Sequence, residues 1–321
     1  MSTLVSIDIS AVNSSLPSPE VKPHGVKVIG CGTFCKVLLF RSRAVKVVSN
    51  SKYSPLLVNE YRVLKKLVGC RNIVRALKLK TICDTSMLVL EYGGMDLFDA
   101  PAPTCTAEKF HIYRQVSCAV EFMHTRDIVH LDIKMENVVI DSSGRVRVID
   151  FGFARILQSD EVESRTLRDW KGSTAYCCPE MLRSALYNGF EADSWSLGIL
   201  VFTMYSRTHP WLRADVDKDR RFARFVQETT SASIAFQKLG ILREAPQWVL
   251  SVINQTIVVD PDRRRRRWSL VIDEPEITHV PSCMQCEDIS MSESRRARES
   301  CISKRVRCVG STLATSMYTE E

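Results

Sequence analysis

A run of chemically active side chains interrupts the apolar middle of the sequence at His130–Asn137, which reads HLDIKMEN. A carboxylate, Asp132, is followed by an ammonium group, Lys134, and then by the carboxamide of Asn137. These groups offer a proton acceptor, a fixed cation and an amide within one short loop. Taken alone the pattern is also compatible with an ordinary polar loop, so its neighbours decide how it is interpreted.

A glycine-rich stretch near the N-terminus offers a second kind of chemistry. Residues Ile29–Val37 read IGCGTFCKV, and Gly30 and Gly32 allow a turn whose backbone N–H groups can lie against phosphates. The alternative is a plain turn, because glycine-rich hairpins are common. Lys46 on the next predicted strand would place a cation beside the same space, and Glu60 on the following helix could pair with it. Both could instead be solvated surface charges.

The hydrophobic periodicity predicts which elements position these residues. Apolar runs and glycine turns predict strands through residues 26–48 and again at 72–82 and 86–91. Residues 55–68 have helical spacing, with Leu57, Tyr61, Leu64 and Val68 on one face. The N-terminal part is therefore expected to be a mostly antiparallel sheet with one helix.

The rest of the chain is mainly helical in pattern. Residues 106–124 form an amphipathic helix pattern for which Thr106 is the expected N-cap. The Asp-Ser-Ser-Gly turn at 141–144 predicts a hairpin between two short strands. The run DSWSLGILVFTMYS at 193–206 is apolar on all sides and predicts a buried helix.

In this order and at these spacings, the motifs resemble those of eukaryotic-type protein kinases over residues 26–268. The resemblance implies an α+β, two-lobed protein kinase fold, with a small antiparallel β-sheet N-lobe that holds one helix and a larger, mainly helical C-lobe. The matching residues are the glycine loop Gly30, Gly32 and Val37, the strand lysine Lys46, the helix glutamate Glu60, the catalytic loop His130–Asn137, the triplet Asp150-Phe151-Gly152, the Cys178-Pro179-Glu180 element, Asp193 and Arg264, which is expected to pair with Glu180.

The resemblance also implies a role for each polar side chain in phosphoryl transfer from ATP with Mg²⁺. Asp132 would accept or orient the proton of the substrate hydroxyl as the catalytic base, and Lys134 would neutralise the γ-phosphate. Asn137 and Asp150 would hold Mg²⁺ through oxygen ligands. The residues implied to contact or position the nucleotide are Ile29, Gly30, Gly32, Val37, Ala44, Lys46, Glu60, Glu91, Gly93, Asp96 and Asp150.

The substrate class follows from two positions of the same resemblance. A lysine two residues after the catalytic aspartate, here Lys134, is similar to serine/threonine kinases rather than tyrosine kinases. Ser173, in the segment GSTAYCCPE, takes the place of the usual threonine and keeps a hydroxyl that could bond Asp132 and Lys134.

Three positions depart from the family pattern, of which Cys178, in place of the alanine of the Ala-Pro-Glu element, is expected to have little effect. Leu131 replaces the arginine that normally pairs with a phosphorylated activation loop, so activity without loop phosphorylation is expected, although Ser159, Ser164 and Thr166 are available there. Cys35 replaces the third loop glycine, and its thiol could be reactive beside the phosphates or quiet and half-buried.

Composition limits the class of protein and its setting. The chain has 321 residues, a formal charge of +7 and 12 cysteines, and it begins without a basic and apolar signal sequence. Free thiols predict an intracellular protein, cytoplasmic or nuclear, and the divergent loop resembles kinases of large DNA viruses, for which the site would be the host cell. The longest apolar run is too short to span a bilayer, so protein substrates and ATP are the expected partners and no membrane is expected.

The predicted domain organisation is a flexible leader at 1–22, a kinase domain at 23–270 and a disordered tail at 271–321. Within the kinase domain, the N-lobe is expected at 23–91 and the C-lobe at 92–270.

Two alternatives remain open at this stage. A pseudokinase scaffold would bind nucleotide or partners without phosphoryl transfer; such proteins typically lack at least one of Lys46, Asp132, Asn137 and Asp150, all of which are present. A basic nucleic-acid binder is disfavoured, because no aromatic residues alternate with basic ones in the folded part. No regulatory partner is predicted.

Overall fold

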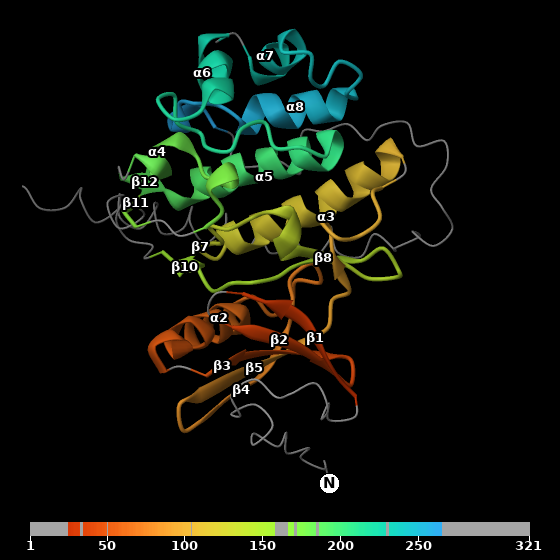
Figure 1. Cartoon of the computed structure of the whole chain (residues 1–321), viewed down its shortest axis with the longest axis vertical. Helices are drawn as coiled ribbons and strands as arrows, with labels where there is room; N and C mark the ends of the chain where they lie inside the picture. Colours follow the sequence, from red (N-terminus) through yellow and green to blue (C-terminus); the bar gives the residue numbers. More distant parts are fainter. Residues whose placement is uncertain are drawn as a thin grey trace, which may run out of the picture.

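The computed structural model describes residues 25–264, apart from 33–34, 50, 104, 158–165, 170–171, 184–185 and 229–230. The described residues form a small β-rich lobe and a larger helical lobe, which lie at the bottom and top of Figure 1. The two-lobed α+β fold is therefore confirmed. The expected leader at 1–22 and tail at 271–321 lie outside the described residues, and the domain boundaries stay a prediction.

A five-stranded antiparallel sheet forms the small lobe, in the order β1-β2-β3-β5-β4. The hairpin between its second and third strands turns at Arg41 and Ser42, whose φ angles of 45° and 59° suit the twist of a two-residue connection. The strands are β1 (Val26–Cys31), β2 (Lys36–Phe40), β3 (Arg43–Val48), β4 (Ala76–Ile82) and β5 (Thr85–Glu91).

One long helix, α2 (Ser54–Lys66), packs against this sheet after the short 3-10 turn η1 (Ser51–Tyr53). It begins with Pro55 in its first turn, where proline costs no hydrogen bond, and Leu57 is buried as predicted. The prediction that Val68 shares this buried face is wrong, because the helix ends before it and Val68 is 59% exposed. Gly69, with φ of +107°, then redirects the chain.

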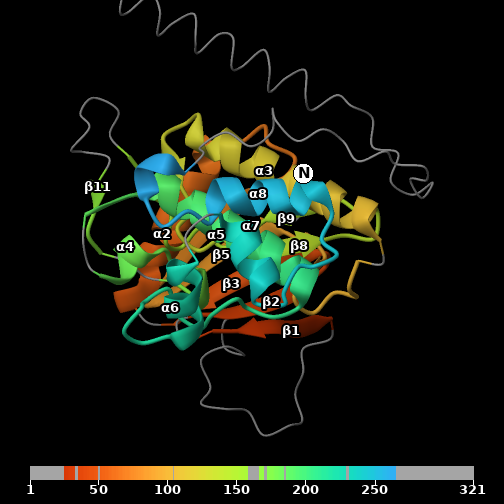
Figure 2. The same ribbon diagram turned by 90° about the horizontal axis from the view of Figure 1, so that it is seen from above.

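Three stacked helices make the centre of the large lobe, with two short ones at its far end (Figure 1; Figure 2). The central helix α5 is buried from Gly189 to Met204, as predicted for a segment that is apolar on every side. The helices are α3 (Thr106–His124), α4 (Pro179–Leu182), α5 (Gly189–Ser206), α6 (Arg220–Gln227), α7 (Ala232–Lys238) and α8 (Gln247–Thr256).

The N-cap of α3 differs from the prediction by one residue. Cys105, not Thr106, has the extended backbone of a cap, and its Sγ accepts a hydrogen bond from the backbone N–H of Glu108 at 3.4 Å. Thr106 is already the first helical residue. A thiol is a weak acceptor, which is why the sequence favoured the neighbouring hydroxyl.

Short strands tie the loops of the large lobe together. The predicted hairpin is present as β8 and β9, which pair Val138 with Val148 across a turn whose Asp141 Oδ1 accepts the N–H of Ser143 at 2.9 Å. The short strands are β6 (Met95–Asp96), β7 (Ile128–Val129), β8 (Val138–Ile140), β9 (Val146–Val148), β10 (Arg155–Ile156), β11 (Thr166–Leu167) and β12 (Tyr187–Asn188). The remaining 3-10 turns are η2 (Met135–Asn137), η4 (Thr174–Tyr176) and η5 (Pro261–Arg263).

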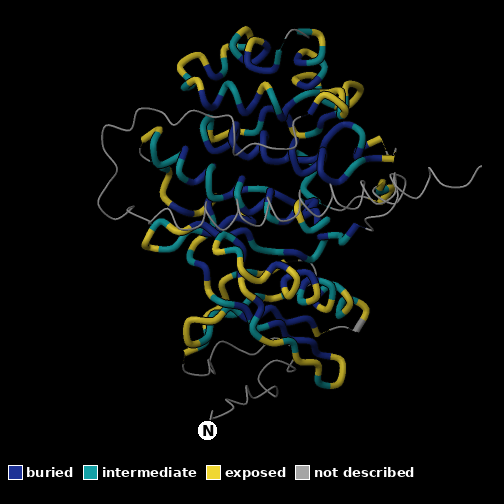
Figure 3. Tube along the Cα trace, turned by 180° about the vertical axis from the view of Figure 1, so that it is seen from behind, coloured by how far each residue is buried: buried dark blue, intermediate teal, exposed yellow. Residues whose placement is uncertain are grey.

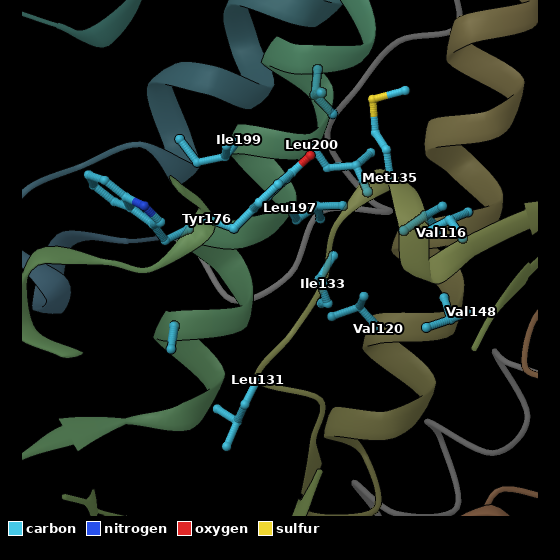
Figure 4. Packing of buried hydrophobic residues seen from close by; sticks show 14 of the residues in the cluster. Val116, Val120, Leu131, Ile133, Met135, Val148, Tyr176, Leu197, Ile199 and Leu200 are labelled. Carbon is cyan, nitrogen blue, oxygen red and sulfur yellow. The ribbon is translucent and has the colours of Figure 1, made fainter. Parts of the chain in front are cut away.

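The main hydrophobic core extends through the large lobe into the side of the small one, as the buried tube in Figure 3 shows. We call His130–Asn137 the polar loop. Its alternate residues Leu131, Ile133 and Met135 belong to this core and lie between α3 and α5 (Figure 4). Burial of such side chains stabilises the fold by about 1.5–3 kcal/mol each. The loop is therefore anchored by its apolar residues, which leaves the intervening polar ones to form a site.

None of the helices in the described part of the chain is both long and apolar enough to span a bilayer.

Candidate active site

A buried carboxylate on α5 fixes the backbone of the polar loop. Asp193, which is fully buried, accepts backbone N–H bonds from His130 and Leu131, each at 2.8 Å. His124 Nε2, at the end of α3, lies 2.9 Å from the same carboxylate. Leu131 adopts φ of +67°, which is uncommon for a non-glycine residue and persists here because both flanking N–H groups are fixed.

Two polar residues of the loop, Lys134 and Asn137, contact the carboxylate of the third, Asp132. Lys134 Nζ lies 2.9 Å from Asp132 Oδ2, and Asn137 Nδ2 donates to the same oxygen at 2.8 Å and to the Asp132 carbonyl at 2.8 Å. Asp132 is 6% exposed, and its other oxygen, Oδ1, accepts the backbone N–H of Ser173 at 3.1 Å. The carboxylate is thus oriented by three donors.

Ser173 links this loop to the segment before α4. Its hydroxyl accepts a hydrogen bond from Lys134 Nζ at 2.7 Å, as expected. Its contact with Asp132 is made by the backbone N–H and not by the hydroxyl, which refines the expectation.

A second cluster joins the two lobes. Lys46 Nζ on β3 donates to both oxygens of Glu60 on α2, at 2.8 and 2.9 Å, and to Asp150 Oδ1 at 2.9 Å. Burial alone would lower the pKa of Lys46, but the attraction of Asp150 and Glu60 raises it well above its ordinary range. The alternative of a solvated surface lysine is excluded, because Lys46 is 6% exposed.

The two carboxylates of this cluster respond in opposite directions. Attraction to Lys46 lowers the pKa of Asp150 to about 2. Burial raises the pKa of Glu60, and the charge of Lys46 opposes that rise. Glu60 also accepts the backbone N–H of Phe151 at 3.3 Å, so α2 is bonded directly to the Asp-Phe-Gly triplet.

The triplet presents its acid to the cleft and buries its aromatic ring. Phe151 is fully buried and packs edge-on against the ring of His130, with centroids 4.8 Å apart. Asp150 has φ of +63° and a side chain that is 47% exposed. The N–H of Ile149 donates to the Asn137 carbonyl at 2.9 Å, which ties the residue before Asp150 to the polar loop.

The oxygens at this junction fit a magnesium ion held jointly with phosphates. Asn137 directs its Nδ2 group toward Asp132, and Asp150 uses Oδ1 for Lys46, so Asn137 Oδ1 and Asp150 Oδ2 have no bond to a described residue. The described part of the chain has no group of three or more His, Cys, Asp or Glu side chains that could hold a metal alone. Mg²⁺ commonly binds in this way, through one or two protein oxygens, substrate phosphates and water.

The glycine-rich hairpin forms one side of the cleft. Gly30 pairs with Val37 across β1 and β2, and Val37 in turn pairs with Lys46 on β3. The N–H of Gly32 donates to the Cys35 carbonyl at 2.9 Å, which closes the loop, while Ile29 is 38% exposed. Ala44, also predicted to contact the nucleotide, lies two residues before Lys46 on β3 and pairs with Leu90 of β5.

Cys35 is a half-buried thiol in this hairpin. Burial raises its pKa, and the attraction of Lys46 only partly offsets that effect. Of the two possibilities for this residue, the structure supports the quiet thiol, because the reactive form is the thiolate.

The predicted hinge residues lie at the end of β5 and just after it. The side chain of Glu91 is occupied: its Oε1 accepts the N–H of Arg75 at 2.9 Å and lies 3.5 Å from Arg147 Nε. A Cβ on Gly93 would lie 2.4 Å from a methyl group of Val139, so only glycine fits there. Asp96 Oδ1 accepts the N–H groups of Phe98 and Asp99 at 3.0 and 2.9 Å, so that oxygen stabilises the turn after the hinge.

Two further contacts support the site from a distance. Arg264 forms the expected ion pair with Glu180, with Nη2 2.9 Å from Oε2, and its guanidinium lies 4.8 Å over the ring of Trp195. Cys178, which stands where the family's Ala-Pro-Glu element has alanine, lies next to this pair and is fully buried.

Some supporting residues were missed from the sequence. His124 is one: a histidine at the end of an amphipathic helix gives no sign that it faces an aspartate 69 positions later. Arg147 is another, although its position between the apolar residues of RVRV could have indicated a buried charge. It bonds Asp141 at 3.0 Å and the Gly93 carbonyl at 3.4 Å.

Comparison with known families agrees with this geometry. The family model described as "Protein kinase domain" matches residues 24–272, and the chain belongs to the protein kinase family. Relatives include the "Probable serine/threonine-protein kinase MARK-A" of Dictyostelium discoideum, 25% identical over 88% of this chain and 26% of that protein. The "Serine/threonine-protein kinase chk-1" of Caenorhabditis elegans is 28% identical over 70% of this chain and 47% of that protein.

A third relative, the "Probable serine/threonine-protein kinase RTK1" of Saccharomyces cerevisiae, is 28% identical over 80% of this chain and 42% of that protein. The chain thus spans about a quarter to a half of the length of these relatives.

Proposed function

We propose that this protein is a serine/threonine protein kinase, which transfers the γ-phosphate of ATP to serine or threonine hydroxyls of protein substrates. The observation that carries the proposal is the convergence of two clusters, Lys46–Glu60–Asp150 and Asp132–Lys134–Asn137. The names of the three relatives support the serine/threonine class. Lys134 and Ser173, which are bonded to each other, support it independently.

In this proposal each side chain acts on a defined atom. Asp132 Oδ accepts or orients the proton of the attacking hydroxyl, and Lys134 Nζ, 2.9 Å away, balances the charge that develops on the transferred phosphoryl group. Lys46 binds the α- and β-phosphates, and Glu60 aims it. Asn137 and Asp150 are the residues that would hold Mg²⁺, which supplies positive charge to the phosphate oxygens when bound.

The pseudokinase alternative predicts nucleotide binding without transfer. A scaffold that only binds nucleotide has no use for Asp132 as a proton acceptor, because Asn137 and Asp150 are the predicted Mg²⁺ ligands. Yet Asp132 is oriented by Lys134, Asn137 and the N–H of Ser173. This positioning favours an enzyme, because it fixes a carboxylate in the orientation that a proton acceptor for the attacking hydroxyl needs.

Transfer of radiolabelled phosphate from ATP with Mg²⁺ to a generic protein substrate tests the proposal. Asp132→Asn removes the proposed general base and should lower the rate by roughly a hundredfold or more. Lys46→Met removes a cation that binds the phosphates and should lower the rate by roughly as much. Asp217→Asn and Lys80→Met are matched controls, because both residues are exposed, and they should retain the wild-type rate.

Phosphoamino-acid analysis then decides the class. Label on serine or threonine supports the proposal, and label on tyrosine contradicts it. Equal incorporation by wild type and both site variants would show a contaminating activity. Nucleotide binding with no transfer would establish the pseudokinase.

The proposal includes an intracellular site of action. The eight cysteines in the described residues are all free thiols, which suits a reducing compartment.

A further inference from the structure

A second concave site lies away from the catalytic residues, where three segments meet. It is a groove of about 380 Å³ bordered by the loop that follows α2, by Glu91 at the end of β5 and by the β8–β9 hairpin. Neither Lys46 nor Asp132 nor Asp150 lines it. We call it the arginine groove, because its lining includes Arg71, Arg75, Arg145 and Arg147.

The arginine groove has uncompensated positive charge. Arg147 is buried and neutralised, since it lies 3.0 Å from Asp141 and 3.5 Å from Glu91. The side chains of Arg71, Arg75 and Arg145 are exposed, and they have no ion pair or hydrogen bond to any residue that the structure describes. Three guanidinium groups therefore remain available for carboxylates, which they bind with two parallel hydrogen bonds.

The floor of the arginine groove is apolar. Leu64, Leu67 and Ile73 line it and are buried beneath it. Val68, which also lines the groove, is 59% exposed, an unusual position for a large apolar residue beside three arginines. An occupant that fits must therefore combine negative charges with at least one apolar side chain.

The walls of the arginine groove are fixed by backbone bonds. The N–H of Val74 donates to the Val148 carbonyl at 3.0 Å, and the N–H of Val148 donates to the Asn72 carbonyl at 2.8 Å. The N–H of Arg75 bonds Glu91 Oε1 at 2.9 Å. The loop that carries Arg71 and Arg75 is thus attached to both the β8–β9 hairpin and β5, so little backbone freedom is lost when a ligand binds.

We propose that the arginine groove binds an acidic linear segment of a partner protein, in which aspartates or glutamates flank a large apolar side chain. The carboxylates pair with Arg71, Arg75 and Arg145, and the apolar side chain covers Val68 and the apolar floor. A continuous polyanion such as a nucleic acid fits less well, because Glu91 is part of the wall and the groove contains no aromatic ring on which a base could stack. The proposal concerns binding and does not depend on phosphoryl transfer.

Fluorescence anisotropy with a labelled short peptide, in which glutamates flank a leucine, tests the proposal on the full chain. The triple variant Arg71→Ala/Arg75→Ala/Arg145→Ala should weaken binding at least about tenfold, because it removes three charged hydrogen-bond donors whose attraction is partly screened by salt. The variant Arg220→Ala/Arg221→Ala/Arg224→Ala is a matched control. It removes the same charge from exposed positions on α6, at the far end of the large lobe (Figure 1), and should bind as the wild type does.

Two altered peptides separate the charged and apolar parts of the occupant. Replacing the glutamates by glutamines should abolish binding, and replacing the leucine by serine should weaken it several-fold. Both triple variants should still show the wild-type thermal shift with Mg²⁺ and ATP, which establishes that they are folded.

Several outcomes would overturn the proposal. One is unchanged affinity of the groove variant for the glutamate peptide. Another is that the wild type binds a single-stranded oligonucleotide at least as tightly as the peptide and that the groove variant abolishes this binding. That result would assign the surface to nucleic acid. Concentration-dependent self-association that only the groove variant prevents would assign it to a second copy of the chain.

Discussion

At the scale of single residues, the cleft is organised by charges that burial forces into pairs. Lys46 is a cation in a nearly dry site, and such a group is tolerated only where opposite charges surround it. Glu60 and Asp150 supply those charges from two different lobes. The same three residues would face the phosphates of ATP. The electrostatics that hold the lobes together are therefore the electrostatics that the ligand would use.

The titration of Asp150 provides a test of this pairing. Its pKa is lowered from 3.8 to about 2 by Lys46, so the ionised form stabilises the folded state above about pH 4, and this stabilisation is lost as the pH falls toward 2. Asp150→Asn should therefore be less stable than wild type near pH 5, and the difference should shrink toward pH 2. Urea unfolding across this range measures it, with the exposed Asp217→Asn variant as a control. A difference that stayed constant with pH would refute the pairing.

Residue chemistry predicted some of these partners and not others. The pairing of Lys46 with Glu60 was expected because a cation on a strand could pair with a carboxylate on the following helix. The contact of Lys134 with Ser173 was expected from the resemblance to protein kinases. The pairing of His124 with Asp193 could not be predicted, since it depends on how two helices cross. No pattern within either helix encodes that crossing.

At the scale of elements, α5 serves as the base on which the polar loop rests. Its buried Asp193 accepts two backbone N–H bonds from residues 130–131, which have no other described acceptor. Most of the polar geometry around Asp132 depends on this support, because those residues immediately precede it.

Replacing Asp193 by asparagine should therefore weaken the fold and the site together. The asparagine amide can accept only one of the two N–H bonds and opposes the other with an NH₂ group, so the free energy of unfolding should fall by roughly 2–4 kcal/mol. Chemical denaturation measures this loss, and the exposed Asp217→Asn variant should lose less than about 0.5 kcal/mol. A loss no larger than that of the control would show that Asp193 does not support the loop.

Element types were predictable, whereas several element ends were not. The strands β1–β3 and the buried helix α5 could be predicted from their apolar runs, because burial in a sheet or on all sides of a helix selects such residues. The end of α2 before Val68 and the Cys105 cap of α3 depend on one or two residues, where periodicity carries little information. The arginine groove was also not predictable, because its arginines come from a loop and a hairpin that meet only in the folded chain.

At the scale of the whole molecule, Leu131 bears on whether phosphorylation of the segment before α4 could regulate activity. The residue is 7% exposed and packs into the core, so no cation at this position faces the segment before α4 (Figure 4). A phosphate on that segment would lack its usual partner from the polar loop.

Phosphoryl transfer should therefore be insensitive to phosphatase treatment of the purified protein. The measurement compares initial rates before and after treatment, with mass spectrometry to confirm that phosphate was removed and a phosphatase-free incubation as the control. Loss of most of the activity after complete dephosphorylation would contradict this expectation and would point to another cation that reads the phosphate.

Joint binding of one ligand by both lobes should appear in the stability of the whole chain. Because Lys46 belongs to the small lobe while Asn137 and Asp150 belong to the large one, Mg²⁺ with ATP should bind only the folded, assembled cleft. At a hundredfold excess over Kd the gain in the free energy of unfolding is about 2.7 kcal/mol, which corresponds to several degrees in Tm.

Differential scanning fluorimetry should show this shift for wild type and for the exposed Lys80→Met variant. The shift should be much smaller for Lys46→Met and Asp150→Asn, and chelation of Mg²⁺ should reduce it for wild type. A full shift in either site variant would mean that the nucleotide binds elsewhere, since a ligand stabilises a fold only through the residues that contact it.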